Sequence, residues 1–228
     1  MALLDADASR DPRQYARETS PDAVARYIRA LIVDGVLRRG DRVPRDDIAR
    51  TLGVSPIPVR EAIIALDREG WLVNEPHRGA FVHGVDERWV TDHYDLMGSL
   101  YALVAARASE RATDLELAEL HAMGRELGRA TSPDEFERVN DRVTRALIAA
   151  ARSPRLDAAL RGITNIVPGN FFAEVPGTME PQRRAMRATI RAVVRRDADA
   201  AAAALRALPR TTGAAVVALL RSRDVIDL

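Results

Sequence analysis

The chain of 228 residues has no cysteine and no lysine, and only 4% of its residues are aromatic. Without cysteine it can form no disulfide, no thiolate metal site and no cysteine nucleophile. No apolar run approaches the ~18 to 20 residues that a membrane-spanning helix needs. The N-terminus carries Asp5, Asp7 and Asp11 instead of the basic start of a secretory signal. We therefore expect a soluble, cytoplasmic protein.

The chain also lacks an excess of charge of either sign. The 34 basic residues are all arginine and face 33 acids, which gives a net charge of +1. This balance alone does not indicate a nucleic-acid partner. Within residues 24–84, ten arginines face eight acids, so any DNA-binding site there should have modest non-specific affinity and depend on dimerisation. The hydrophobic content of 47% is enough for one large core or two modest ones.

The first third of the chain predicts three helices. Ser20-Pro21-Asp22 is a typical helix start, with a capping hydroxyl, a proline in the first turn and an acid close behind. Apolar residues then recur at helical spacing up to Ile32. A second, short helix is expected over about 46–52. The turn Gly53-Val54-Ser55 leads into a third helix that stops at Gly70.

Two short strands should follow these helices. Trp71-Leu-Val and Gly79-Ala-Phe-Val-His83 have strand-forming residues, and residues 75–78 between them form a turn. This order predicts a winged helix-turn-helix over residues 19–84, preceded by a flexible tail at 1–18.

The remainder, residues 85–228, predicts an all-helical second domain. Thr113 to Glu116 and Ser132 to Glu135 have the spacing of capping boxes, and Pro209 should kink or break the last helix. The helices are expected at about 86–111, 113–130, 133–152, 154–166, 180–195 and 198–222, with a loop over 167–177. The fold class is thus mainly α, with a small β-wing near the N-terminus and an antiparallel helical bundle at the C-terminus.

Several short motifs of the first domain occur together with this domain order. They are Gly40-Asp-Arg-Val43, Ile48-Ala49, Leu52-Gly-Val-Ser55, Pro58-Val-Arg-Glu-Ala62, Leu66, Glu69-Gly70 and Arg78-Gly-Ala-Phe-Val82. With them the chain resembles the GntR family of bacterial transcription regulators, in the FadR-type branch whose C-terminal domain is the helical FCD bundle. The resemblance spans nearly the whole chain.

The resemblance implies that the third helix enters the major groove of DNA and that the wing reaches a minor groove. By position, Arg60 contacts a base edge or a phosphate, and arginine suits guanine because its fork binds O6 and N7 together. Ser55 and the first turn of that helix should meet phosphate. The other implied DNA contacts are Arg45, Ile57, His77, Arg78 and Gly79.

Two departures from the family pattern reduce the expected DNA contacts. Pro56 and Asp46 occupy positions where the family often has arginine, and a carboxylate near phosphate repels it. Arg45 is a possible substitute for the arginine missing at Asp46. The alternatives are that Arg60 only forms an ion pair with a neighbouring acid and that Arg78 is only a surface residue of the turn.

In many members of the family the second domain holds a metal through an Asp or Asn and three histidines. The matching positions here are Asn140, Thr144, Met186 and Leu208, and residues 122–228 contain no histidine. Because imidazoles make such a site tight for zinc or nickel, we predict no metal and no cofactor. His93 and His121, the two histidines of the bundle, are read as surface or core residues.

The second domain of such regulators normally binds an effector. Met97 and Tyr101 stand where the family often has an arginine and a glutamate, which favours a neutral or apolar ligand over a carboxylate. The candidate pocket residues are Tyr94, Met97, Tyr101, Asn140, Thr144, Met186 and Ile190. The alternative is that they only fill a core, and for Phe171 and Phe172 a lid over the bundle and a dimer contact both remain open.

The favoured hypothesis is a ligand-responsive, homodimeric repressor that reads an inverted repeat in double-stranded DNA. The alternative is a DNA-binding regulator whose helical domain only dimerises or docks a protein partner. An enzyme has no candidate residues, because the chain has no phosphate-cradling glycine loop, nucleophile elbow or paired zinc motif.

Overall fold

The computed structural model describes residues 20–163, 166–167, 169–206 and 208–226. These residues form two compact units. The first holds the described chain up to Glu87 with residues 166–167 and 218–226, and the second holds 88–163 and the rest of 169–217. The structure is mainly helical with one two-stranded antiparallel sheet, as predicted. The tail predicted at 1–18 lies outside the described residues.

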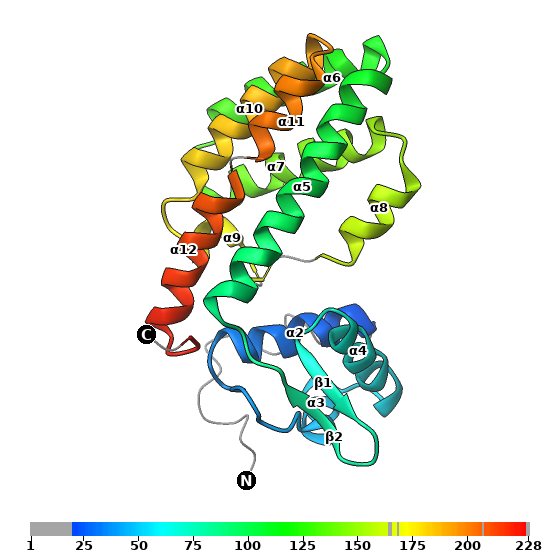
Figure 1. The fold of residues 1–228 in the computed structure, drawn as a ribbon, viewed down its shortest axis with the longest axis vertical. Coiled ribbons are helices and arrows are strands. Elements are labelled where there is room, and N and C mark those ends of the chain that lie inside the picture. The colour runs from blue at the N-terminus through cyan, green and yellow to red at the C-terminus, as the bar shows by residue number, and fades with distance from the viewer. Residues whose placement is uncertain (1–19, 164–165, 168, 207, 227–228) are drawn as a thin grey trace. The chain divides into compact units, whose positions relative to one another are not determined.

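Three helices build the first unit. α2 (Pro21–Val33) begins where the sequence predicts, because the Ser20 hydroxyl accepts a hydrogen bond from the Ala23 backbone N–H at 3.3 Å. α3 (Arg45–Leu52) ends at Gly53, whose φ of 65° is the left-handed conformation that glycine adopts without strain. α4 (Pro56–Arg68) packs against α2 and α3 through its apolar face (Figure 1).

The sheet of this unit is a hairpin of β1 (Leu72–Glu75) and β2 (Gly79–Val82), with Leu72 opposite Val82. The first strand begins one residue later than predicted. The reason is that the Trp71 N–H donates to the Leu66 carbonyl at 2.9 Å and so closes the end of α4. The segment around Arg42 lies along β2, because Val82 N donates to Asp41 O and Val43 N donates to Ala80 O, both at 2.9 Å.

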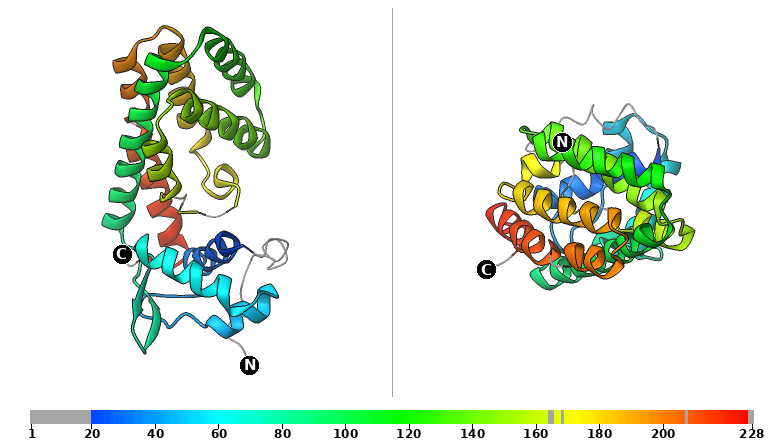
Figure 2. Two further views of the ribbon diagram at one scale, coloured as in Figure 1. Left: turned by 90° about the vertical axis from the view of Figure 1, so that its right-hand side faces the viewer. Right: turned by 90° about the horizontal axis from the view of Figure 1, so that it is seen from above.

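The second unit is a helical bundle. Its helices are α5 (Glu87–Arg111), α6 (Asp114–Arg129), α7 (Pro133–Ala150), α8 (Pro154–Arg161), α9 (Phe171–Glu174), α10 (Met179–Val194), α11 (Ala198–Arg206) and α12 (Leu208–Ser222), of which the first residue of α5 and the end of α12 belong to the first unit. Within the bundle, α6 packs against α7 and α10, and α10 packs against α11. The long helix α5 extends along the unit (Figures 1 and 2).

Two sequence expectations for this unit were wrong. α8 ends at Arg161, well before residue 166, because the chain leaves the helix at Gly162. The loop predicted at 167–177 contains the short helix α9, which the Asn170 side chain caps by accepting from the Phe172 and Ala173 N–H groups, each at 3.1 Å. The interruption predicted at Pro209 stays a prediction, because α11 and α12 are separated by residue 207, which lies outside the described residues, and Pro209 is the second residue of α12.

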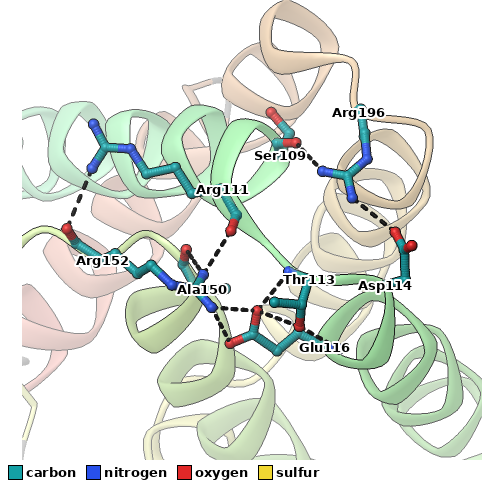
Figure 3. Close-up of polar contacts among 8 residues, drawn as sticks. All are labelled: Ser109, Arg111, Thr113, Asp114, Glu116, Ala150, Arg152 and Arg196. Carbon is teal, nitrogen blue, oxygen red and sulfur yellow. Dashed lines mark hydrogen bonds and ion pairs between the residues drawn. The ribbon is translucent and has the colours of Figure 1, made fainter.

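One end of the bundle is fixed by a polar network around Glu116 (Figure 3). The Glu116 carboxylate accepts from the Thr113 N–H at 2.7 Å, and the Thr113 hydroxyl accepts from the Glu116 N–H, so the predicted capping box is present. Arg152, which follows α7, donates to the same carboxylate at 2.9 Å and to the Arg111 carbonyl at 2.7 Å. The network thereby ties the end of α5 and the start of α6 to the end of α7.

This network predicts a pH-dependent stability. The hydrogen bonds from Thr113 and then Arg152 lower the pKa of Glu116 from 4.5 to about 2. A lowered carboxyl pKa stabilises the fold above pH 4.5, and that stabilisation is lost as the pH falls toward 2. We expect Glu116→Gln to lower the melting temperature by a few degrees at pH 7. Circular dichroism melts should show this difference shrinking between pH 4.5 and pH 2, and a pH-independent difference would contradict the assignment.

Candidate DNA-binding surface and ligand cavity

The N-terminus of α4 presents several groups to solvent. Ser55 is the N-cap and is exposed, and its hydroxyl makes no capping hydrogen bond. Pro56 and Pro58 have no N–H, so Ile57 carries an unpaired first-turn donor of this helix. The Ile57 side chain is 67% exposed. This helix end therefore offers a hydroxyl, an amide donor and an apolar side chain together.

Arg60 lies one turn further along α4. Val59, Ile63 and Leu66 face the core of the unit, whereas Arg60 is exposed. Among the described residues, no carboxylate forms an ion pair with its guanidinium. The geometry therefore gives no support to the alternative that Arg60 only pairs with a neighbouring acid.

The wing tip brings the other predicted contacts together. His77 is exposed and has a φ of 62°, a left-handed conformation that is uncommon for a non-glycine residue. Arg78 forms an ion pair with Glu75, and its guanidinium carbon lies 5.7 Å from the centre of the Phe81 ring. Gly79 has a φ of 111°, and a Cβ there would lie 3.0 Å from the Arg42 Nε atom. The Arg78 side chain is thus partly engaged within the wing.

Arg42 is a surface arginine that sequence reasoning missed. It lies beside Gly79 because its backbone bridges to Phe81 on β2, a pairing between segments far apart in sequence. Arg45 is exposed at the start of α3 and lines a surface hollow together with Arg42 and Asp46. The Asp46 carboxylate thus stands in a hollow with two arginines, which reduces the repulsion expected of it.

The bundle contains a cavity of about 130 Å³. Six of the seven predicted pocket residues line it, namely Tyr94, Met97, Tyr101, Asn140, Thr144 and Met186. The seventh, Ile190, is not among the lining residues. It is buried, and a Cβ at Gly124 would lie 3.3 Å from its Cδ1 atom, so Ile190 packs against α6.

Several lining residues escaped the sequence analysis. Glu137 and Asp141 flank Asn140 on α7, and their helical spacing from it places all three on one side of that helix. Phe171 and Phe172, whose role the sequence left open, line the cavity from α9. The helical spacing of Glu137 and Asp141 from Asn140 was a sequence signal for both carboxylates. The prediction used only the positions of the family's metal ligands and so did not include them.

Burial raises the pKa of four groups that line the cavity. It raises the pKa of Tyr94, whose hydroxyl is buried and makes no hydrogen bond to any described residue. It also raises the pKa of Tyr101, and the nearby Asp141 adds to that rise. Burial also raises the pKa of Glu137 and of Asp141. The hydrogen bond from the Phe171 N–H to Glu137 and the positive charge of Arg145 near Asp141 lower these pKa values, but by less. The cavity therefore holds carboxyl groups whose charge is incompletely compensated.

The four positions that match the family's metal ligands all line this cavity. They are Asn140, Thr144, Met186 and Leu208. Asn140 accepts a hydrogen bond from Gln182 at 3.0 Å, and the other three supply a hydroxyl, a thioether and an alkyl group. Among the described residues there is no group of three or more His, Cys, Asp or Glu that could hold a metal ion. The donor set does not fit zinc or nickel.

Both halves of the chain match the models of known protein families. Residues 21–82 match the model of the gntR family of bacterial regulatory proteins, and residues 92–210 match the FCD domain. The chain is 32% identical over 193 residues to an uncharacterised HTH-type transcriptional regulator of Mycobacterium tuberculosis (strain ATCC 25618 / H37Rv), which covers 85% of this chain and 79% of the relative. It is 35% identical over 83 residues to the Nta operon transcriptional regulator of Aminobacter aminovorans, which covers 36% and 40%.

Solved structures share the fold. E. coli McbR/YncC superimposes with a TM-score of 0.58 at 21% identity, covering 90% of this chain and 98% of that one. A GntR family member from Pseudomonas syringae pv. tomato gives a TM-score of 0.52 at 22% identity, with 90% and 87% coverage. Members of this family are transcription regulators rather than enzymes. This chain belongs to the GntR family and is a DNA-binding transcription regulator with an FCD domain.

Proposed function

We propose that this regulator is a homodimeric, ligand-responsive repressor that reads a short inverted repeat. The observation that carries the DNA-contacting part is the free, exposed surface of α4 at Ser55, Ile57 and Arg60. An arginine fork reads guanine in the major groove, and an exposed aliphatic side chain contacts a thymine methyl group. Ser55 and the helix N-terminus bind phosphate and set the register of the helix.

The wing supplies the second set of contacts. His77, Arg78 and Gly79 at its tip reach the minor groove, where width and potential rather than a full base code are read. Arg42 lies beside this tip, and Arg45 lines the same surface hollow as Arg42, so both add phosphate contacts. Specific affinity then depends on summing two half-sites, since the charge balance of the reading unit is close to neutral.

Residues 19–84 are the DNA-binding domain in this proposal, and residues 85–228 are the effector-binding and dimerisation domain. FCD domains bind small-molecule effectors, and the cavity of the bundle is the site proposed here. Regulation requires that the effector and the operator prefer different arrangements of the dimer, because a ligand with equal affinity for both shifts nothing. The ligand lowers operator affinity if the protein is a repressor.

In a second candidate function, the protein binds DNA but senses no small molecule. In that case the cavity is a packing defect, and the bundle serves only for dimerisation or for docking a protein partner. A thermal-shift screen of small metabolites, followed by operator titrations with each stabilising compound, separates the two. A compound that raises the melting temperature and lowers operator affinity supports sensing. If no compound does both, the second candidate function holds.

Dimerisation is proposed through an apolar stripe on α5. Leu96 is 54% exposed and Leu103 is 46% exposed, and two helical turns separate them, so they share one face. We expect Leu96→Glu with Leu103→Glu to give a monomer in analytical ultracentrifugation, with at least about tenfold weaker binding to a two-half-site operator.

The matched control for the dimer variant is Leu115→Glu on α6, because Leu115 is 71% exposed and lies on another helix. It should remain dimeric and bind DNA normally. A dimeric Leu96/Leu103 double variant would contradict this choice of interface.

A cytoplasmic location follows from the proposed role, since the operator is there. By length and composition alone, the helical stretch Ala198–Ser222 could cross a membrane. Val216 and Leu220 within this stretch are fully buried. Core helices of water-soluble proteins pass the same test, so we do not propose a membrane span.

A further inference from the structure

The charge of the cavity identifies a class of ligand. We propose that it binds a small organic cation, an ammonium group carried on an apolar body about the size of one aromatic ring. The inference rests on the proposed effector role of the cavity and states which chemistry that effector has.

The lining charges are of one sign. Glu137 and Asp141 supply carboxylates, and none of the described lining residues is arginine or histidine. Arg145 acts on Asp141 but does not line the cavity. Arg183, a buried arginine on α10 that does not line the cavity, donates to the Glu180 carboxylate at 2.8 Å and lies over the Phe136 ring. A carboxylate ligand would meet uncompensated negative charge here, whereas an ammonium ion would neutralise it.

Aromatic rings surround the same space. Tyr94 and Tyr101 line it from α5, and Phe171 and Phe172 line it from α9. The Phe171 and Phe172 rings are nearly perpendicular, at 88°, with centroids 5.4 Å apart. The negative face of an aromatic ring attracts a cation, and the attraction is larger where water is excluded.

A polar group without a partner gives an independent indication of a ligand. Tyr94 is 1% exposed and lines the cavity, and its hydroxyl oxygen makes no hydrogen bond to any described residue. A buried hydroxyl without a partner is costly, so such groups normally have one. An ammonium N–H donated to this oxygen would satisfy it, while the carboxylates compensate the charge.

The size of the cavity limits the body of the ligand. Its volume is about 130 Å³. An apolar cavity of ~150 Å³ accepts benzene, so one ring fits and a bicyclic body does not. Benzylamine combines such a ring with a primary ammonium group. Benzyl alcohol and benzoate have nearly the same shape and are neutral and anionic, so the three compounds differ mainly in charge.

The test compares these three compounds on the full-length protein by isothermal titration calorimetry and thermal shift. We expect benzylamine to bind about tenfold or more tightly than either of the others, which is the size of one charge-assisted hydrogen bond. If benzoate or benzyl alcohol binds as tightly as benzylamine, the inference is wrong and the effector role stands. If none binds, the inference is wrong, and failure of the wider metabolite screen then removes the effector role as well.

Variants of the lining residues test whether benzylamine binds in this cavity. Glu137→Gln with Asp141→Asn, and separately Tyr94→Phe, should each weaken benzylamine binding by about tenfold. Glu119→Gln with Asp199→Asn is the matched control, because both side chains are exposed outside the cavity and the pair changes the net charge as much as the double variant. It should leave binding unchanged. Equal benzylamine affinity in all variants would place the binding elsewhere and overturn the inference. The wild-type comparison of the three compounds does not depend on any variant folding.

Discussion

Replacing Arg60 by alanine is expected to weaken operator binding by roughly 10- to 100-fold per half-site, because one bidentate arginine–guanine contact contributes about 1–3 kcal/mol. The melting temperature should stay unchanged. Arg60 is exposed and has no ion pair with any described residue, so its removal breaks no contact within the fold. Fluorescence anisotropy with a labelled operator, at fixed salt, measures the change.

Two further variants separate specific contact from charge. Arg68→Ala removes the same charge from the exposed far end of α4 and should weaken binding only slightly. Arg60→Lys keeps the charge but lacks the planar fork, so it should bind non-specific DNA normally and lose preference for the operator. If Arg60→Ala and Arg68→Ala weaken binding equally, Arg60 acts only as a charge and α4 is not the reading helix.

The second large effect concerns stability. Arg29 on α2 and Glu69 at the end of α4 form an ion pair at 2.7 Å, with side-chain exposures of 7% and 17%. Glu69→Ala would leave a buried guanidinium without its carboxylate, and loss of one partner of a buried pair costs about 3–5 kcal/mol. We expect this loss in urea denaturation of the first unit. Trp71, which is buried there, reports on it by fluorescence in a Trp89→Phe background.

The same unit provides a control for the Glu69 variant. Arg50 and Asp47 form an exposed ion pair at 2.7 Å, with side-chain exposures of 70% and 32%. Arg50→Ala should cost no more than about 1 kcal/mol, since solvent screens such pairs. If Glu69→Ala costs as little as Arg50→Ala, the buried pair does not hold α2 to α4. The family motif Glu69-Gly70 then has another explanation.

Local signals explain why most helices were predictable. Ser20 and Thr113 cap helices through hydrogen bonds within four residues, and such contacts can be read from sequence spacing alone. The helix α9 was missed because its four residues carry no periodicity, and only the Asn170 cap marks it. The early end of α8 at Gly162 depends on where the chain turns, which periodicity does not encode.

Some residues of the candidate sites were predicted and others were not, again because local signals can be read from the sequence and tertiary contacts cannot. Arg60 and the six cavity residues were predicted from the family resemblance and from helical spacing; the structure shows the first exposed and the others lining the cavity. Arg42 was missed because its bridge to Phe81 joins segments far apart in the chain. The carboxylates of Glu137 and Asp141 changed the expected ligand from neutral or apolar to cationic. Their place on the cavity wall depends on how α7 faces α5 and α9, which is a matter of tertiary packing.

Footprinting on the DNA upstream of the protein's own gene tests the central claim most directly. Wild-type protein should protect two half-sites in inverted repeat, centred about one helical turn apart or a multiple of it. Arg60→Ala should lose this protection at the same protein concentration, while Arg68→Ala retains it. Protection spread evenly along the DNA, or a footprint unchanged by Arg60→Ala, would contradict sequence reading by α4.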